Sequence, residues 1–254
     1  MTLAKRCIDG FDLLKNLGAV PAAHFALQRL RNRVAPPELL TVRSRYAAFP
    51  LACRRGTSDL EVFGQIFSHR EYRCLDSVRD AGLIIDCGAN VGFSSAYFLT
   101  RYPTAEVIAV EPDSGNFAAL QRNLAPYGSR AKPLRAGIWW RSAGLMVTDS
   151  AYAGDGREWA RGVREATEGE TPEVHAVDIG TLFDKSGHDR ISILKIDIEG
   201  SEEAVFDAPC PWLERVDNLV IELHGPSCEA SFRRAIDRHG FKMSTCDELV
   251  VCMR

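Results

Sequence analysis

The chain has 254 residues, 46% of them hydrophobic and 9% aromatic, which is enough to bury one sizeable core or a main domain with a small appendage. Its 31 basic and 34 acidic side chains give a formal net charge of -3, so no strongly basic field argues for a nucleic-acid partner. The 8 cysteines are scattered without metal-site spacing, which is typical of thiols in a reducing compartment. No signal-like segment and no apolar run of about 18 residues occurs, so we expect a soluble, cytoplasmic protein without a membrane span.

The first 56 residues are expected to form a helical N-terminal extension with a possible hairpin. Two short helices are predicted over 6–34, and a β-hairpin over 41–55. A further helix is predicted over 57–67, because Ser58 and Glu61 have the spacing of a capping box. The extension could pack on the core, support a homodimer or cover a site, and its sequence does not rank these roles.

From residue 83 onwards, short apolar strands alternate with helical segments. Strands are predicted at 83–88, 106–112, 131–139, 174–179, 191–197, 218–224, 241–246 and 248–253. Helices are predicted at 93–102, 114–124, from about 201, and at 228–240. This alternation predicts a doubly wound, mostly parallel α/β sheet with helices on both faces, closed at its far side by a C-terminal antiparallel hairpin.

A glycine loop follows the first of these strands, with the sequence Asp86-Cys87-Gly88-Ala89-Asn90-Val91-Gly92. Glycines let the backbone turn tightly and approach a ligand closely. The next helix points its free N–H groups at whatever binds there. Many α/β turns need glycine for packing alone, so the loop by itself is weak evidence of a site.

The second strand ends in Glu111 and Pro112. Glu111 is either a solvated strand-end charge or an acceptor for both hydroxyls of a ribose, and the glycine loop before it favours the ribose. The dinucleotide fingerprint G-x-G-x-x-G is absent, which disfavours a nicotinamide cofactor. S-adenosylmethionine suits a loop that offers N–H donors and retains the acid Asp86.

Charged side chains mark the ends of two later strands. Lys195, Asp197 and Glu199 share one face of the first, with the two carboxylates about 7 Å apart along the strand. Glu222 and His224 end the second. Ligands of open α/β sheets bind beyond these strand ends, so we expect an active site there. Lys195 and Glu222 could instead be a structural ion pair, and His224 a satisfied strand-end histidine.

These residue types suit the activation of a hydroxyl group. Asp197 and His224 are the candidate bases, and Glu199 would orient one of them or the substrate. As an alternative, Asp197, Glu199 and Glu222 could hold Mg²⁺ between them. The metal is not favoured, because no second carboxylate-rich motif supports it.

Four motifs together resemble the FkbM family of S-adenosylmethionine-dependent methyltransferases. They are "IIDCGANVGFSS", "VIAVEPDSGNFAALQRN", "ILKIDIEGSE" and "VIELH", and the resemblance covers roughly 57–225. It implies a class I methyltransferase domain over 57–254 with a seven-stranded sheet. It also implies that Gly88, Asn90 and Gly92 line the cofactor and that Glu111 holds its ribose, with Asp86, Pro112 and Asp197 nearby.

The segment over about 139–173 is long for a connection, which predicts a lid-like insertion or a substrate loop. The aromatic residues that could stack on a sugar are Trp139, Trp140, Tyr152 and Trp159. The arginines that could bind an anionic group are Arg157, Arg161 and Arg164. The alternative is a solvated, mobile segment. Ser58 and Asp59 either cap a helix or contact cofactor or substrate, since they fit the family pattern.

The sequence therefore predicts an O-methyltransferase that acts on a hydroxyl of a small-molecule or saccharide acceptor. N- or carboxyl-methylation by the same scaffold is the alternative within this class. A nicotinamide-dependent oxidoreductase and a non-catalytic nucleoside-binding protein are the alternatives outside it.

Overall fold

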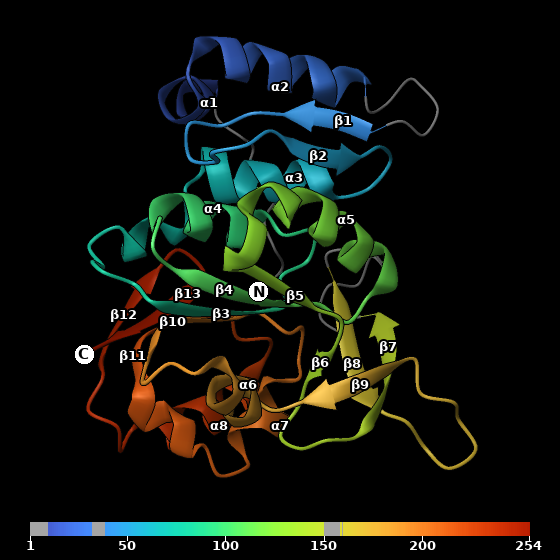
Figure 1. Ribbon diagram of the computed structural model, residues 1–254, viewed down its shortest axis with the longest axis vertical. Coiled ribbons are helices and arrows are strands. Elements are labelled where there is room, and N and C mark those ends of the chain that lie inside the picture. Colours follow the sequence, from blue (N-terminus) through green and yellow to red (C-terminus); the bar gives the residue numbers. More distant parts are fainter. Residues whose placement is uncertain (1–9, 32–38, 150–157, 159) are drawn as a thin grey trace.

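The computed structural model describes residues 10–31, 39–149, 158 and 160–254, and centres on a seven-stranded sheet (Figure 1). Its strands are β3 (Leu83–Cys87), β4 (Glu106–Val110), β5 (Ala131–Leu134), β10 (Ile191–Ile196), β11 (Val216–Ile221), β12 (Lys242–Cys246) and β13 (Leu249–Met253). Their order across the sheet is β12-β13-β11-β10-β3-β4-β5. The chain thus places β4 on one side of β3 and later returns to place β10 on the other, which creates a topological switch point at β3 and β10.

Neighbouring strands from β5 to β11 run parallel, and β13 runs antiparallel to both of its neighbours. The predicted α/β fold with a C-terminal hairpin is therefore present. The hairpin closes one side of the sheet, where β13 lies inside and β12 forms the edge.

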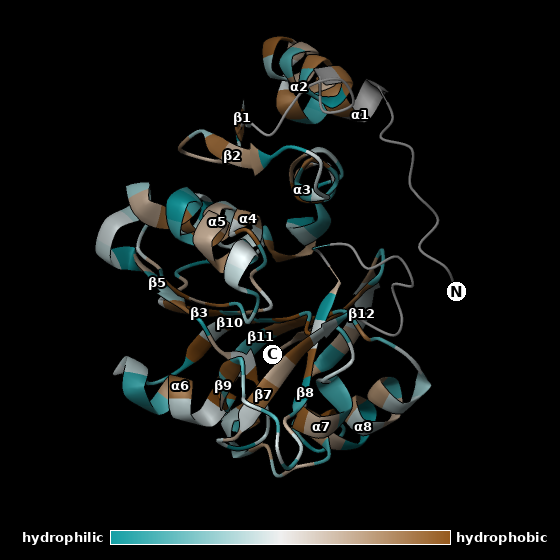
Figure 2. Cartoon of the chain, turned by 90° about the vertical axis from the view of Figure 1, so that its right-hand side faces the viewer, coloured by the Kyte–Doolittle hydropathy of each residue, from teal (hydrophilic) through white to brown (hydrophobic). Residues whose placement is uncertain are grey.

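Two helical layers cover the sheet (Figures 1 and 2). One face carries α4 (Phe93–Arg101) and α5 (Ser114–Leu124), and the other carries α6 (Ile179–Ser186), α7 (Glu202–Phe206) and α8 (Pro226–Ile236). Short 3₁₀ helices span Ala125–Arg130 and Pro211–Arg215. Successive strand residues serve opposite cores: Ile84 packs in the first and Ile85 in the second. Burial on both faces explains why these strands are almost continuously apolar.

The N-terminal segment packs onto the same core as α4 and α5. It comprises α1 (Gly10–Leu17), α2 (Ala19–Arg31), β1 (Leu39–Val42), β2 (Leu51–Arg54) and α3 (Asp59–Phe63). β1 and β2 form the expected hairpin, and the Phe25 and Phe63 rings lie 5.2 Å apart. α3 continues as a π-helical segment (Gly64–Ser68), followed by a 3₁₀ helix (Glu71–Leu75).

The capping box predicted at Ser58 is wrong. No side-chain hydrogen bond caps α3, and the Ser58 hydroxyl instead donates to the Glu158 carboxylate at 3.3 Å. A partner a hundred residues away replaced the local one, which sequence spacing cannot reveal.

The described part of the insertion forms a second, four-stranded sheet, which we call the small sheet. Its strands are β6 (Gly137–Ile138), β7 (Gly144–Asp149), β8 (Arg161–Glu165) and β9 (Val174–Val177), in the order β6-β9-β7-β8. The single strand expected over 131–139 is divided, because β5 ends at Leu134 and β6 joins the small sheet. Buried Leu145 and Val174 give this sheet a core of its own, so this part of the insertion is an ordered wall.

Among the described helices, none has the length and apolar character that crossing a lipid bilayer requires.

Candidate active site

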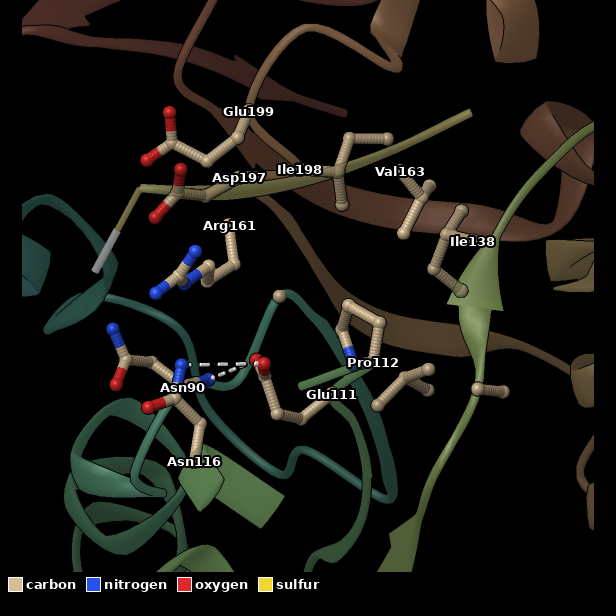
Figure 3. Close-up of a pocket in the computed structure, with 13 residues that line it drawn as sticks. Asn90, Glu111, Pro112, Asn116, Ile138, Arg161, Val163, Asp197, Ile198 and Glu199 are labelled. Carbon is tan, nitrogen blue, oxygen red and sulfur yellow. Dashed lines mark hydrogen bonds between the residues drawn. The ribbon is translucent and has the colours of Figure 1, made fainter. Parts of the chain in front are cut away.

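A pocket opens at the carboxyl ends of β3, β4 and β10, with the small sheet as its far wall (Figure 3). The glycine loop contributes Gly88 and Asn90, and the end of β4 contributes Glu111 and Pro112. The remaining polar lining includes Asn116, Arg161, Asp197 and Glu199. The apolar lining includes Ala136, Ile138, Val163 and Ile198. A pocket with an apolar wall and a few convergent polar groups is the usual form of a small-molecule site.

The glycine loop is shaped by contacts inside the protein. Gly88 has φ +76, and a Cβ built on it would lie 1.7 Å from the Asp197 carbonyl oxygen. Gly92 has φ +84, and a side chain there would meet Leu120 and Leu124 of α5. Gly92 therefore allows α4 to pack against α5, whereas Gly88 lets the loop cross the end of β10. Of the two, Gly88 lines the pocket.

Gly88→Ala is expected to destabilise the protein far more than a left-handed backbone alone would. The matched control is Gly187→Ala at the end of α6, which has φ +77 and open space around it, and should cost only about 1–2 kcal/mol. Thermal unfolding of both variants measures the difference. Equal losses of stability would show that the loop does not need its close approach to Asp197.

Glu111 is buried and holds the loop in place. Its carboxylate accepts hydrogen bonds from the backbone N–H groups of Asn90 at 2.8 Å and Asp113 at 3.0 Å, and from the Asn116 side chain at 3.4 Å. Burial raises the pKa of Glu111 to about 7, although these hydrogen bonds lower it. The carboxylate has about four acceptor sites, and the three bonds leave one of them free, on the oxygen that Asn90 contacts, while the 3.4 Å bond from Asn116 is long enough to yield to a second hydroxyl donor.

Asp86 lies beneath the loop and does not line the pocket. Its side chain is fully buried and accepts hydrogen bonds from the Ser94 and Ser95 hydroxyls at 2.6 Å each. The Lys195 ammonium lies 3.3 Å from its other oxygen. Any effect of Asp86 on a bound cofactor would therefore pass through the position of the loop.

Lys195 joins the loop to Asp197. Its buried ammonium donates to the Gly88 carbonyl at 2.6 Å and lies 3.5 Å from the Asp197 carboxylate. Burial lowers the pKa of Lys195, but the negative charges of Asp86 and Asp197 raise it by more than burial lowers it. The ammonium group therefore stays cationic. The structural ion pair considered for Lys195 and Glu222 is wrong, because Lys195 pairs with Asp86 and Asp197 instead.

His224 faces four carboxylates. Its Nδ1 contacts Glu202 at 2.9 Å, and its Nε2 lies 3.9 Å from Asp197, 3.6 Å from Glu199 and 3.7 Å from Glu222. Burial lowers the pKa of His224, but the Glu202 hydrogen bond and the nearby carboxylates outweigh burial and raise it to about 10. An imidazole that is already protonated at neutral pH cannot accept a proton, so this geometry disfavours His224 as the base.

Two carboxyls of this electrostatic cluster, Glu222 and Glu71, have raised pKa values. Burial raises the pKa of Glu222, and the negative charge of Asp197 adds to the effect. Burial also raises the pKa of Glu71 to about 7, helped by Asp197 and opposed by Lys195. Sequence analysis missed Glu71, because it comes from a 3₁₀ helix outside the strand-end motifs.

Three side chains of the cluster could together hold a metal ion. Among the described residues, Asp197, Glu199 and His224 each offer a ligand atom, and these atoms lie within 4.8 Å of one another. The set differs from the predicted one, in which Glu222 stood in place of His224. An imidazole nitrogen suits a transition metal better than Mg²⁺, which prefers oxygen ligands.

The candidate substrate residues are dispersed. Ser58 and Asp59 are buried but do not line the pocket, and Asp59 pairs with Arg54. The Trp139 indole donates to Glu165 at 2.6 Å within the small sheet, away from the pocket lining. Trp159, Tyr152 and Arg157 lie outside the described residues.

The arginines of the insertion separate into two environments. Arg161 forms an ion pair with Asp149 and points into the pocket from the start of β8 (Figure 3). Arg164 pairs with Glu170 through two 2.7 Å hydrogen bonds at the surface. Only the first is placed to meet a ligand.

The sheet order and the position of the pocket are those of a class I methyltransferase. A family model described as the methyltransferase FkbM domain matches residues 86–243, well over half of the chain. The chain therefore belongs to the FkbM family and is a methyltransferase.

Similar proteins carry related descriptions. Methyltransferase 1 of Beauveria bassiana is 29% identical over 62% of this chain and 72% of its own length. The hexuronic acid methyltransferase AglP of Haloferax volcanii is 24% identical over 59% of each chain. Among solved structures, precorrin-6y C5,15-methyltransferase of Geobacter metallireducens superposes with a TM-score of 0.43 and 12% identity, covering 73% of this chain and 86% of that one.

Proposed function

We propose that this methyltransferase uses S-adenosylmethionine to methylate a hydroxyl group of a saccharide or secondary metabolite. The observation that carries the proposal is the pocket itself. It brings Glu111, the glycine loop and Asp197 together at the switch point of the sheet. Membership of a methyltransferase family argues against the nicotinamide-dependent and non-catalytic alternatives.

The lining residues fit a nucleoside with an amino-acid tail. Glu111 would accept hydrogen bonds from the ribose hydroxyls, and Pro112, Ile138 and Val163 supply apolar surface for the base. Asn90 and Gly88 border the region between Glu111 and Asp197, where the tail would lie. When bound, the cofactor supplies a methyl group activated by a positively charged sulfur.

Asp197 is the base in this mechanism. The Asp197 carboxylate would take the proton that the acceptor hydroxyl loses as its oxygen accepts the methyl group, and the pocket would hold that oxygen facing the donor. Alignment of the reactants supplies much of the rate, and a base adds about 10²–10⁴-fold. Lys195, 3.5 Å from Asp197, restrains this carboxylate without using the pocket.

The acceptor class rests on two observations. Asp197, Glu199 and Arg161 give the pocket both hydrogen-bond acceptors and donors, which suits a polyhydroxylated molecule. A relative acts on a hexuronic acid according to its name. N- or carboxyl-methylation remains the alternative. Methyl transfer assayed on a panel of sugars, uronic acids and amines distinguishes O-, N- and carboxyl-methylation.

Calorimetric titration with S-adenosylhomocysteine is expected to show micromolar binding at pH 8, where Glu111 is ionised. Parallel titrations with NADH, and with Mg²⁺ or Mn²⁺ present, complete the experiment. Binding of NADH without binding of S-adenosylhomocysteine would overturn the proposal. A large gain in affinity or turnover with metal would assign Asp197, Glu199 and His224 to a metal site instead of to direct proton transfer.

A further inference from the structure

Arg54, which is partly exposed, forms an ion pair with buried Asp59 and also contacts Asn116, which lines the pocket. The Arg54 Nε and Nη2 atoms donate to the two Asp59 oxygens at 3.0 and 2.8 Å, and the Arg54 backbone N–H donates to the same carboxylate at 2.7 Å. Asp59 is only 1% exposed. The pair joins β2 to α3, and both elements precede the region 86–243 that the family model matches.

The same guanidinium reaches the cofactor side of the pocket through Asn116. Arg54 Nη2 donates to Asn116 Oδ1 at 2.8 Å, and Asn116 Nδ2 donates to Glu111 Oε1 at 3.4 Å. A guanidinium can only donate and a carboxylate can only accept, so the Asn116 amide has a single orientation that satisfies both. Arg54 therefore determines which end of Asn116 faces Glu111.

The insertion also contacts the Asn116 side chain, through Glu158. Asn116 Nδ2 also donates to the Glu158 carbonyl at 2.7 Å, while the Glu158 carboxylate accepts from the Ser58 backbone N–H at 3.2 Å. The N-terminal segment, α5 and the insertion thus converge on Asn116, which is 1% exposed. A buried polar group with several partners is costly to disturb, because each lost partner leaves an unsatisfied donor or acceptor.

We infer that Arg54, Asp59 and Asn116 form a positioning relay that sets Glu111 for cofactor binding. The segment 54–59 is then a working part of the cofactor site, although it lies outside the matched family region. The inference rests on the proposed function, in which Glu111 binds the ribose. None of the three residues needs to touch the reacting atoms, so the relay should act on affinity and not on the chemical step.

The test is the affinity for S-adenosylhomocysteine from pH 6 to pH 9, with turnover measured at saturating S-adenosylmethionine. Arg54→Met should weaken binding by roughly tenfold at pH 7, the scale of one hydrogen bond to a charged group. Because the Asn116 hydrogen bond lowers the pKa of Glu111, the variant should also move the pH midpoint of binding upward. Turnover at saturation should stay within about twofold.

Two variants keep the experiment decisive if Arg54→Met folds poorly. Arg54→Lys retains the charge and should recover part of the affinity. Combining Arg54→Met with Asn116→Ala should weaken binding no further than Asn116→Ala alone, since residues of one relay are not additive. Arg190→Met is the control, because this arginine forms an ion pair of similar length, 2.6 Å to Asp217, at the opposite end of β10.

The outcomes separate the relay from the proposed function. If Glu111→Gln weakens binding but Arg54→Met leaves both affinity and pH midpoint unchanged, the relay is wrong and the cofactor assignment stands. Additive losses in the double variant would also reject the relay. If Glu111→Gln itself has no effect, the ribose assignment fails and the relay fails with it.

Discussion

Glu111→Gln is expected to weaken S-adenosylhomocysteine binding by about 10- to 150-fold, the equivalent of about 1.5–3 kcal/mol for hydrogen bonds to a charged group. The substitution keeps the size of the side chain but removes the charge that two ribose hydroxyls would share. It also places an amide where Asn90 and Asp113 now donate to a carboxylate. Calorimetry at pH 8 measures the loss directly.

The pH dependence of S-adenosylhomocysteine affinity is a second test of the role of Glu111. Burial raises the pKa of Glu111 to about 7, so the carboxyl takes up a proton as pH falls through this value and loses acceptor capacity. Affinity should therefore fall below pH 7 and level off above it. Since hydroxyl donors favour the ionised form, binding near pH 7 should release a proton, which changes the apparent enthalpy between buffers.

The matched control is Glu106→Gln at the opposite end of β4. Glu106 pairs with Lys132 at the surface and is remote from the pocket lining. Its affinity and pH profile should match those of the unmodified protein. If Glu111→Gln stayed within twofold of the unmodified protein, Glu111 would be a loop-ordering residue only.

The hydrophobic pattern of the sequence was sufficient to predict the main sheet and the position of the pocket at its edge. The strands that end at Cys87, Val110 and Ile196 are apolar on both faces, and parallel strands place their carboxyl ends together. The positions of Gly88, Glu111 and Asp197 around one pocket follow from these two facts. No strand was predicted for β7 and β8 of the small sheet, and β8 carries charged residues such as Arg161 and Arg164.

The charge pairings could not be read from sequence, because they depend on register. Lys195 stands opposite Asp86 in the pairing of β10 with β3, and opposite Val220 in the pairing with β11. That register gives Lys195 the buried carboxylate of β3 and leaves Glu222 beyond the end of β11. A sequence shows that Lys195 needs a partner, but not which neighbour supplies it.

Other differences between the sequence predictions and the structure arise because side chains bind partners from distant segments of the chain. The Ser58 hydroxyl binds Glu158 instead of capping α3, and Arg54 binds Asn116, 62 residues away. Both contacts appear only when the N-terminal segment packs beside α5. The role of His224 could not be predicted from sequence for the same reason. Its hydrogen bond to Glu202, 22 residues away, raises the pKa of the imidazole, which is therefore protonated and not the base that the sequence suggested.

Asp197→Asn is expected to lower turnover by about 10²–10⁴-fold, the usual contribution of a general base. The amide keeps the shape of the carboxylate but cannot take the hydroxyl proton. Affinity for S-adenosylhomocysteine should change little, because Glu111 and not Asp197 makes the proposed ribose contacts. Single-turnover methyl transfer to the best acceptor of the panel measures the chemical step, and calorimetry measures the affinity.

Asp207→Asn provides the comparison, since this exposed carboxylate follows α7 and pairs with Arg234 outside the pocket. Unchanged turnover in Asp197→Asn would remove Asp197 from the mechanism and direct attention to Glu71, whose pKa of about 7 suits proton transfer at neutral pH. Loss of turnover that added Mn²⁺ restores would instead indicate that Asp197 serves as a metal ligand. A loss confined to the chemical step, independent of metal, is the result that the geometry predicts, because Asp197 is the carboxylate held by Lys195 at the mouth of the pocket.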